Sequence, residues 1–533
     1  MNDHPETHFV DEHVPEDGAR VILRNGRFVD VINGRYFGPE VSVVLQGDRI
    51  AAMPGVPGQD SDMRPDFAID LGGRTVLPGL FNTHCHINMA STTMLPRLGD
   101  ISLNKKHRER QRAKNMAECL AHGITNIRDA YTEDLRCNWA LREEISRGEM
   151  PGPRIVQSVV VGPPGSYLAE KLGVVLRIMG SATLGITRID HSRSEAGVVE
   201  FSIDATAGEV RDAVDRAIDE RGAEAIKIGE QRENMSNRKP NSTIMRIDQL
   251  EALSNQASRR GKKTLMHHTS VESFRRGVRA GVSTLSHLPF DASLTKEDVE
   301  AFKAAECIME PTISVAYGIT WKIKGDPLFD HPEMNRLTQY RDKVYTYAAL
   351  ADEYYLPELR DSLIWSYKNK ASGKFKVLGL LNMSRMFRYY TQQVWHGFDN
   401  FRLLFEHGAR MALSNDGGIP PCTPAMMAFE LDFFDFVLGR EPGMKRLSGA
   451  EAARIATINS ACSMGLEKDF GSIEPGKMAD LVIIDGDPFE DPHVLGSRVA
   501  ALFMDGRLRI NNCGLEIQQG GADQQEMPAR VDG

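Results

Sequence analysis

The chain has 533 residues, of which 41% are hydrophobic and 26% charged, and its formal net charge is −9. These values are typical of a folded protein too large for one hydrophobic core, and they exclude a mostly disordered or fibrous chain. The acidic balance argues against binding through phosphate contacts, so we expect no nucleic-acid partner. The sequence contains no run of 18 apolar residues, so we predict no membrane span, and the acidic N-terminal residues are unlike a secretory signal. Seven cysteines without a C-x-x-C pair do not indicate a disulfide framework, and we expect a cytoplasmic protein.

Changes in composition divide the chain into predicted segments. Residues 1–18 hold six acidic residues and no Lys or Arg, which is typical of a disordered arm. Residues 19–74 contain alternating apolar stretches broken by Asn-Gly and Gly-Asp pairs, which is the pattern of β-hairpins. Short strands return in 464–515, and we expect the two stretches to combine into one small β-sandwich domain built from both chain ends. Residues 516–533 are predicted to be a polar tail.

Between these segments, residues 75–463 alternate between strand and helix patterns. We predict strands near 75–80, 123–129, 154–161, 223–229, 263–267, 283–287, 307–313 and 410–415. Helices are predicted at 104–121, 133–147, 207–221, 246–260, 270–280 and 295–305. Eight strands separated by helices indicate an α/β fold of the (β/α)8 TIM-barrel type rather than a dinucleotide-binding sheet.

Polar residues at the C-terminal ends of barrel strands converge on one site. Here these residues are His84, His86, Lys227, His267, His287 and Asp416. His84 and His86 are two positions apart on a strand, so both imidazoles point to one face and can chelate one metal ion. Histidine pairs of this kind also occur on surfaces, but Lys227 lies between apolar neighbours, where an unpaired ammonium is costly. The six residues together therefore predict a metal site.

The segments that carry these residues resemble the amidohydrolase superfamily, within it the Xaa-Pro dipeptidase-like and imidazolonepropionase-like hydrolases. The resemblance spans about residues 20–515 and is carried by VLPGLFNTHCH, GITNIRDA, AEAIKI, TLMHH, AGVSTLSHL and LSNDGG. The later segment INSACSMGLEKDFGSIEPGKMADLVIID is a specific signature of the superfamily and contains no metal ligand. Two independent blocks of sequence therefore agree.

The resemblance implies a metal-dependent hydrolase with a binuclear centre. His84, His86 and Asp416 would bind the first divalent ion, and His267 and His287 would bind the second. Zinc is the expected metal, and manganese, cobalt and iron also suit histidine and carboxylate ligands.

The resemblance also assigns chemical roles within this centre. Lys227 would bridge the two ions as an N-carboxylated lysine, because an ammonium cannot ligate a metal. Asp416 would contact the metal-activated hydroxide, act as general base, and later pass a proton to the leaving group. His267 and His268 are adjacent, so only one can share the face of the site; the spacing to the next strand favours His267.

Two stretches longer than a barrel needs are expected to determine the substrate. The first is 162–206, and the second is 317–401, which holds nine of the twelve tyrosines and three of the four tryptophans. The second stretch has helical patterns and is either a lid over the site or a dimer interface. The candidate substrate-binding residues are Arg128, Tyr167, His191 and Tyr317. For Arg128, substrate contact is the alternative; the favoured interpretation of Arg128 and Asp129 is an ion pair that supports the barrel mouth.

We expect hydrolysis of an amide-type C–N bond in a small molecule: a peptide, N-acyl amino acid, carbamate or urea with a bulky apolar or aromatic group. A deaminase or cyclic-amide hydrolase of the same superfamily is the alternative. Deaminases usually use one metal and do not need the bridging lysine, so Lys227 argues against them. A non-catalytic scaffold is a remote third reading, because such proteins typically lose ligands. The family resemblance also leads us to expect a homo-oligomer.

Overall fold

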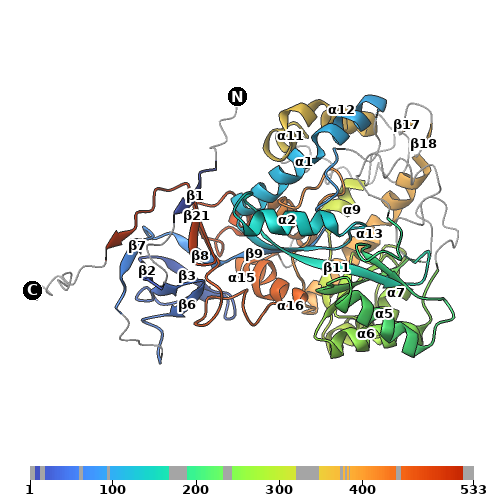
Figure 1. Cartoon of the computed structure of the whole chain (residues 1–533), viewed down its shortest axis with the longest axis horizontal. Coiled ribbons are helices and arrows are strands. Elements are labelled where there is room, and N and C mark those ends of the chain that lie inside the picture. Colours follow the sequence, from blue (N-terminus) through green and yellow to red (C-terminus); the bar gives the residue numbers. More distant parts are fainter. Residues whose placement is uncertain are drawn as a thin grey trace, which may run out of the picture.

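The computed structural model describes residues 7–12, 18–58, 64–92, 97–166, 189–231, 243–319, 347–371, 376–377, 381–382, 384–439 and 446–519. Strands and helices of the middle of the chain form a barrel, and strands from both chain ends form two sheets beside it (Figure 1). Among the described residues, no helix combines the length and apolarity needed to cross a membrane.

The barrel is a parallel sheet that closes on itself. Its seven strands, in spatial order, are β9 (Leu80–Cys85), β10 (Ile124–Asp129), β11 (Arg154–Gly162), β13 (Ala225–Glu230), β14 (Lys263–His268), β15 (Thr284–Ser286) and β16 (Ile308–Glu310). The segment 410–417 completes the ring. The Met309 amide donates to the Arg410 carbonyl at 2.9 Å, and the Thr83 amide donates to the Leu413 carbonyl at 3.0 Å. These contacts confirm the predicted (β/α)8 barrel. The short β12 (Val198–Glu200) pairs in parallel with the last three residues of β11.

Helices follow the strands at nearly the predicted positions. They are α1 (Leu98–Ala121), α2 (Arg136–Ser146), α5 (Ala207–Asp219), α6 (Ile247–Arg259), α7 (Val271–Arg279), α8 (Lys296–Ala304) and α13 (Ser384–Glu406). Polar caps fix two of the starts: the Thr206 side chain accepts from the Glu209 amide before α5, and the Thr295 side chain accepts from the Asp298 amide before α8. This part of the chain also contains α9 (Ile313–Ile319), α14 (Met427–Leu438), α15 (Gly449–Arg454) and α16 (Ser460–Met464).

The prediction of the first barrel strand at 75–80 was wrong. Residues Thr75–Pro78 form β8, which pairs with strands of the chain-end sheets, and the barrel strand β9 begins at Leu80. Gly79 separates the two strands. A Cβ atom there would lie 2.2 Å from Thr125 Oγ1, so the close approach of the chain to β10 requires glycine.

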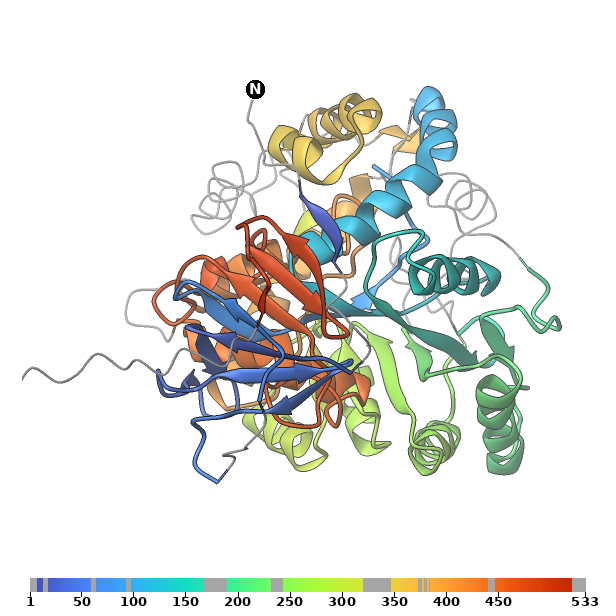
Figure 2. The same cartoon turned by 60° about the vertical axis from the view of Figure 1, so that its left-hand side comes forward.

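The chain-end sheets contain strands from both termini, as the predicted β-sandwich requires (Figure 2). The seven-stranded sheet has the order β1 (Phe9–Glu12), β21 (Arg507–Asn511), β20 (Ala501–Met504), β19 (Leu481–Ile484), β8, β3 (Arg27–Asp30) and β4 (Arg35–Tyr36). The five-stranded sheet has the order β22 (Gln518–Gln519), β7 (Phe67–Asp70), β2 (Arg20–Arg24), β5 (Val43–Gln46) and β6 (Arg49–Ala52). Phe28, Ile69 and Phe503 lie in their common hydrophobic core.

Strand β1 differs from the prediction that residues 1–18 form a disordered arm. Phe9–Glu12 pair with β21 in an antiparallel register that aligns Phe9 with Ile510. The edge of β21 offers unpaired backbone groups, and pairing with them outweighs the acidic composition of this segment.

The described part of the 317–401 insertion is largely helical. It contains α11 (Tyr347–Tyr354), the 3-10 turn Pro357–Leu359, α12 (Arg360–Ala371) and the strand pair β17 (Lys376–Val377) and β18 (Leu381–Asn382), and it ends within α13. Helices α11 and α12 lie beside α1 in both views (Figures 1 and 2). The Gln111 side chain of α1 donates to the Tyr354 carbonyl and accepts from the Leu356 amide, both at 2.9 Å.

Candidate metal centre

His84, His86 and Asp416 form a compact group at the C-terminal end of the barrel. One candidate ligand atom from each lies within 4.8 Å of the others. Asp416 Oδ1 is 3.0 Å from His86 Nε2 and 3.4 Å from His84 Nε2. This buried oxygen nevertheless has no hydrogen-bond partner among the described residues. Three ligand atoms that converge without bonding one another fit a shared metal ion.

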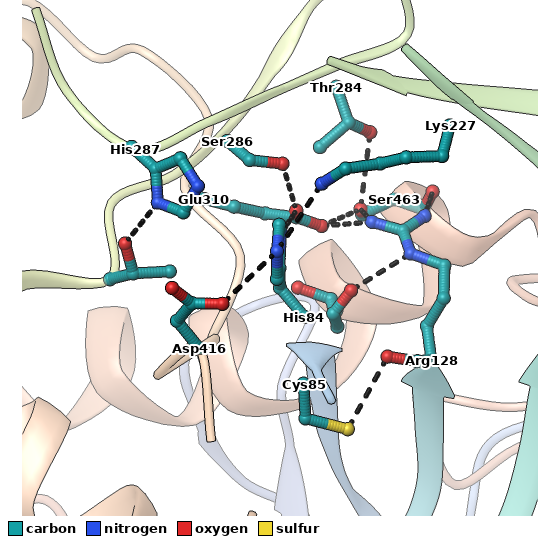
Figure 3. A network of polar contacts seen from close by, with 12 residues as sticks. His84, Cys85, Arg128, Lys227, Thr284, Ser286, His287, Glu310, Asp416 and Ser463 are labelled. Carbon is teal, nitrogen blue, oxygen red and sulfur yellow. Dashed lines mark hydrogen bonds and ion pairs between the residues drawn. The ribbon is translucent and has the colours of Figure 1, made fainter. Parts of the chain in front are cut away.

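Lys227 and two further histidines lie beside this group. The ring centroids of His84 and His287 are 5.1 Å apart, and those of His287 and His267 are 4.7 Å apart. Lys227 Nζ lies 3.4 Å from His84 Nε2, as the close view shows (Figure 3). His84 therefore contacts both Asp416 and Lys227, and its ring also lies next to that of His287. The six residues selected from the sequence are therefore in one place.

Each of the four imidazoles has one ring nitrogen beside an oxygen of the protein. His84 Nδ1 faces a Glu310 carboxylate oxygen at 3.3 Å, and His86 Nδ1 faces the Tyr131 carbonyl at 3.4 Å. The arrangement is the same in His287, whose Nδ1 lies 2.8 Å from the Thr312 hydroxyl.

In His267 the two ring nitrogens exchange roles: Nε2, rather than Nδ1, faces a protein oxygen, the Gln231 side-chain oxygen at 2.6 Å. A neutral imidazole that donates from one nitrogen presents a lone pair on the other. These contacts therefore indicate which nitrogen of each ring can bind a metal.

Burial keeps His84 and His287 in the neutral form that a metal requires. Burial, helped by the nearby Lys227 ammonium, lowers the pKa of His84 to about 4. Burial likewise lowers the pKa of His287 to about 3, and it lowers the pKa of Lys227 to about 8. For Asp416, burial alone would raise the pKa, but the contacts with His86 and His84 hold it well below its usual range. A carboxylate and neutral imidazoles are the ionisation states that bind divalent ions.

Backbone strain also concentrates here. His287, Thr312 and Asp416 have φ values of 71°, 47° and 53°, a region that side chains other than glycine rarely adopt. Such conformations persist where surrounding contacts hold them, and they cluster at functional sites. In this protein they turn the two candidate ligands and the Thr312 hydroxyl toward the centre.

Arg128 is not available for substrate, contrary to one prediction. Its side chain is fully buried, and its guanidinium donates to the Thr83 and Ser463 carbonyls at 2.8 and 2.9 Å. It forms an ion pair with Glu310 of β16, not with Asp129 (Figure 3). All of its observed contacts are with the barrel interior, so its role is structural.

Glu310 is the residue of this network that the sequence analysis missed. Its carboxylate has no exposure, and it contacts His84, Arg128, Ser286 and Ser463. Burial alone would raise the pKa of Glu310, but Arg128 and His84 hold it at about 2. Glu310 ends the observed strand β16, but the sequence predicted this strand to continue to residue 313, so the search for polar residues at strand ends did not select it.

Two neighbours of the candidate ligands point elsewhere. The Cys85 thiol is directed away from the centre and lies 3.4 Å from the Arg128 carbonyl (Figure 3). His268 faces the outside of the barrel, where its ring packs 5.9 Å from that of Phe274 in α7. The strand alternation therefore places His267, and not His268, beside His287.

The remaining candidate substrate residues are less well defined. His191 lies between Glu133 and Glu200, with one ring nitrogen 3.1 Å from a carboxylate oxygen of each. The contact with Glu133 is the main cause that raises the pKa of His191. Tyr167 lies outside the described residues, and so does the side chain of Tyr317.

Comparisons with known proteins agree with this geometry. A family model described as the amidohydrolase family matches residues 75–509. The chain is 33% identical over 85 residues to adenine deaminase from Sinorhizobium fredii, and 33% identical over 112 residues to imidazolonepropionase from Symbiobacterium thermophilum. These matches cover 16% and 21% of this chain and 14% and 25% of the two relatives.

Solved structures resemble almost the whole chain at low sequence identity. A Xaa-Pro dipeptidase with bound methionine has a TM-score of 0.62 at 20% identity, over 92% of this chain and 100% of that chain. Aspergillus niger ochratoxinase has a TM-score of 0.61 at 17% identity, over 93% of this chain and 97% of that chain. These likenesses concern the fold. Because the family model spans most of the sequence, the chain belongs to the amidohydrolase family.

Proposed function

We propose that this protein hydrolyses an amide-type C–N bond of a small molecule at a centre of two divalent metal ions. The observation that carries the proposal is the convergence of four imidazoles, Lys227 and Asp416 at the C-terminal end of the barrel. That end of a TIM barrel is where active sites lie. A peptide, an N-acyl amino acid, a carbamate and a urea all contain the bond in question.

The ligands divide into two sets. His84, His86 and Asp416 would hold one ion, and His267 and His287 the other. When bound, such ions polarise a carbonyl, acidify a water molecule and stabilise negative charge on oxygen. We expect zinc, although manganese, cobalt and iron suit the same ligands.

Lys227 is proposed to be N-carboxylated. As an ammonium it would repel a nearby cation, and its burial opposes the charge, since its pKa falls to about 8. Addition of the neutral Nζ to carbon dioxide, with loss of one proton, gives a carbamate with two oxygens. Beside His84 Nε2, such a carbamate would supply the negatively charged oxygen ligands that an ammonium cannot provide.

Asp416 is proposed to move the proton. Its Oδ1 is buried, lies between two imidazoles, and is aimed at the point where the ligand atoms converge. As the general base it would take a proton from the attacking water at this oxygen. It would then donate the proton to the leaving nitrogen. The products would be an amine and an acid: a carboxylic acid from a peptide or N-acyl amino acid, a carbamic acid from a urea, or a carbonic acid monoester from a carbamate.

The substrate is proposed to carry a bulky apolar or aromatic group. The aromatic-rich insertion 317–401 supports this expectation, and its helices α11 and α12 approach the barrel mouth near the Asp416 loop. There the Tyr355 hydroxyl donates to the Pro421 carbonyl at 3.1 Å. His191 is a further candidate contact, and we also expect a cytoplasmic homo-oligomer.

A deaminase is the second candidate function. The local match to adenine deaminase favours it, although that match covers 16% of the chain. The buried Lys227 beside His84 Nε2 favours hydrolysis at two ions instead. The two functions differ in their product: an amine from an amide, or ammonia from a ring amine.

Protein loaded with zinc, manganese or cobalt would be incubated with dipeptides, N-acyl amino acids, carbamates, phenylureas and aminopurines. We expect amine release from one of the first four classes, reduced about 10²- to 10⁴-fold in Asp416→Asn. Asp469→Asn is the matched control, because that carboxylate is half exposed and pairs with Arg49. Ammonia release from aminopurines without amide cleavage would instead establish the deaminase.

A further inference from the structure

Glu310 is a fully buried carboxylate that takes no direct part in the proposed chemistry. It ends β16, directly beneath the candidate metal centre, and lies at the middle of the polar network in Figure 3. A buried carboxylate is costly unless it is paired and hydrogen-bonded. Its contacts therefore indicate what it does.

The two carboxylate oxygens have different partners. Oε1 accepts from the Arg128 guanidinium and from the Ser463 hydroxyl, the latter at 2.8 Å. Oε2 accepts from the Ser286 hydroxyl at 2.9 Å and faces His84 Nδ1 at 3.3 Å. Arg128 thus balances the charge on one side, while the other oxygen is directed at a candidate metal ligand.

An ionised carboxylate can only accept hydrogen bonds. The ring nitrogen that faces it must therefore carry the hydrogen, which places the lone pair of His84 on Nε2. That nitrogen lies 3.4 Å from Asp416 Oδ1 and 3.4 Å from Lys227 Nζ, at the point where the ligand atoms converge. The geometry thus selects one tautomer of His84.

His84 differs in this respect from the other three imidazoles. The oxygens described above for His86, His287 and His267 belong to a carbonyl, a hydroxyl and an amide, which are uncharged. When one ring nitrogen donates its hydrogen to a carboxylate, the other ring nitrogen becomes a more basic metal ligand than when the acceptor is uncharged.

We infer that Glu310 is a positioning residue that fixes the metal-binding tautomer of His84 and strengthens the site formed by His84, His86 and Asp416. This inference rests on the proposed function. Glu310 acts through His84 and touches neither substrate nor the reacting atoms. Arg128 acts one step further away, because it keeps Glu310 ionised in the barrel interior.

The test must separate this role from the stability of a buried ion pair. Replacing Glu310 alone would leave the Arg128 charge uncompensated and would endanger folding. Two double variants avoid this difficulty: Arg128→Met with Glu310→Gln, and Arg128→Met with Glu310→Leu. Both lack the ion pair, and they differ in whether position 310 offers an acceptor to His84.

The measurement is the dissociation constant of cobalt(II), obtained by competition with a chelator and followed by the cobalt absorption spectrum. We expect cobalt to bind about 10- to 100-fold more weakly to the leucine double variant than to the glutamine double variant. Thermal unfolding of both metal-free variants serves as the folding control. Equal cobalt affinities in the two variants would overturn the inference. Wild-type protein that binds no cobalt would overturn the proposed function itself.

Discussion

The ionisation of the buried Glu430 of α14 should make the stability of the metal-free protein depend on pH. Its side chain has no exposure, and its two oxygens accept from the Ile313 and Ser314 amides at 2.6 and 2.8 Å. These amides begin α9, directly after the strained Thr312 that contacts His287. Burial, with a smaller contribution from Asp416, raises the pKa of Glu430 from 4.5 to about 7.

The sign of the effect follows from linkage. A carboxyl group whose pKa is higher in the folded state contributes stability fully below its unfolded pKa and loses that contribution as the pH rises through the folded pKa. For Glu430 the loss totals about 3 kcal/mol, of which about 2.5 kcal/mol falls between pH 5 and pH 8. For a chain of this length that corresponds to about 2 °C in melting temperature.

The assay compares wild type with Glu430→Gln, both treated with chelator, in thermal unfolding at pH 5 and pH 8. The glutamine cannot ionise, so the wild-type melting temperature should fall by about 2 °C relative to the variant as the pH is raised. Glu490→Gln, at an exposed position, is the control and should follow wild type. Parallel profiles for wild type and Glu430→Gln would refute the reasoning.

Three further substitutions test other parts of the molecule. Thr312→Val removes the hydroxyl that His287 Nδ1 contacts, so metal analysis should show weaker binding of one of the two ions, whereas Thr312→Ser should bind both. Equal loss of metal in the two variants would contradict this role of Thr312. Phe274→Ala removes a fully buried ring and should cost about 3–5 kcal/mol, measured as a lower melting temperature; an unchanged value would exclude its place in the core. Arg154→Met breaks the ion pair of β11 with the buried Asp480 and should destabilise by a similar amount, about 3–5 kcal/mol; a neutral effect in the same melting assay would show that this contact does not stabilise the fold.

Local periodicity predicted the barrel because each strand and helix leaves its own pattern in the sequence. It failed at TVLPGLFNTHC, where β8 and β9 form one apolar run. The break at Gly79 depends on the approach of Thr125, a contact between residues 46 positions apart that local sequence cannot express. The disordered-arm prediction for β1 failed for the same reason, since its partner β21 lies near the other end of the chain.

The candidate ligands could be identified because a barrel brings its strand ends together in a known way. The contacts that support these ligands could not be predicted from the sequence. Arg128 and Glu310 pair across 182 positions, and sequence spacing does not reveal whether an arginine at a strand end faces the mouth or the interior. For the same reason the exchange of nitrogen roles in His267, which depends on Gln231, emerges only from the structure.

The proposed two-metal centre depends on Lys227. It is tested most directly by elemental analysis of wild type and Lys227→Ala, both purified without chelator. We predict about two ions per chain in wild type and a sharp fall in the variant, because the group proposed to join the two ligand sets is lost. One ion per chain in both proteins would contradict the bridged centre and favour the deaminase. No metal in a well-folded wild type would contradict the hydrolase altogether.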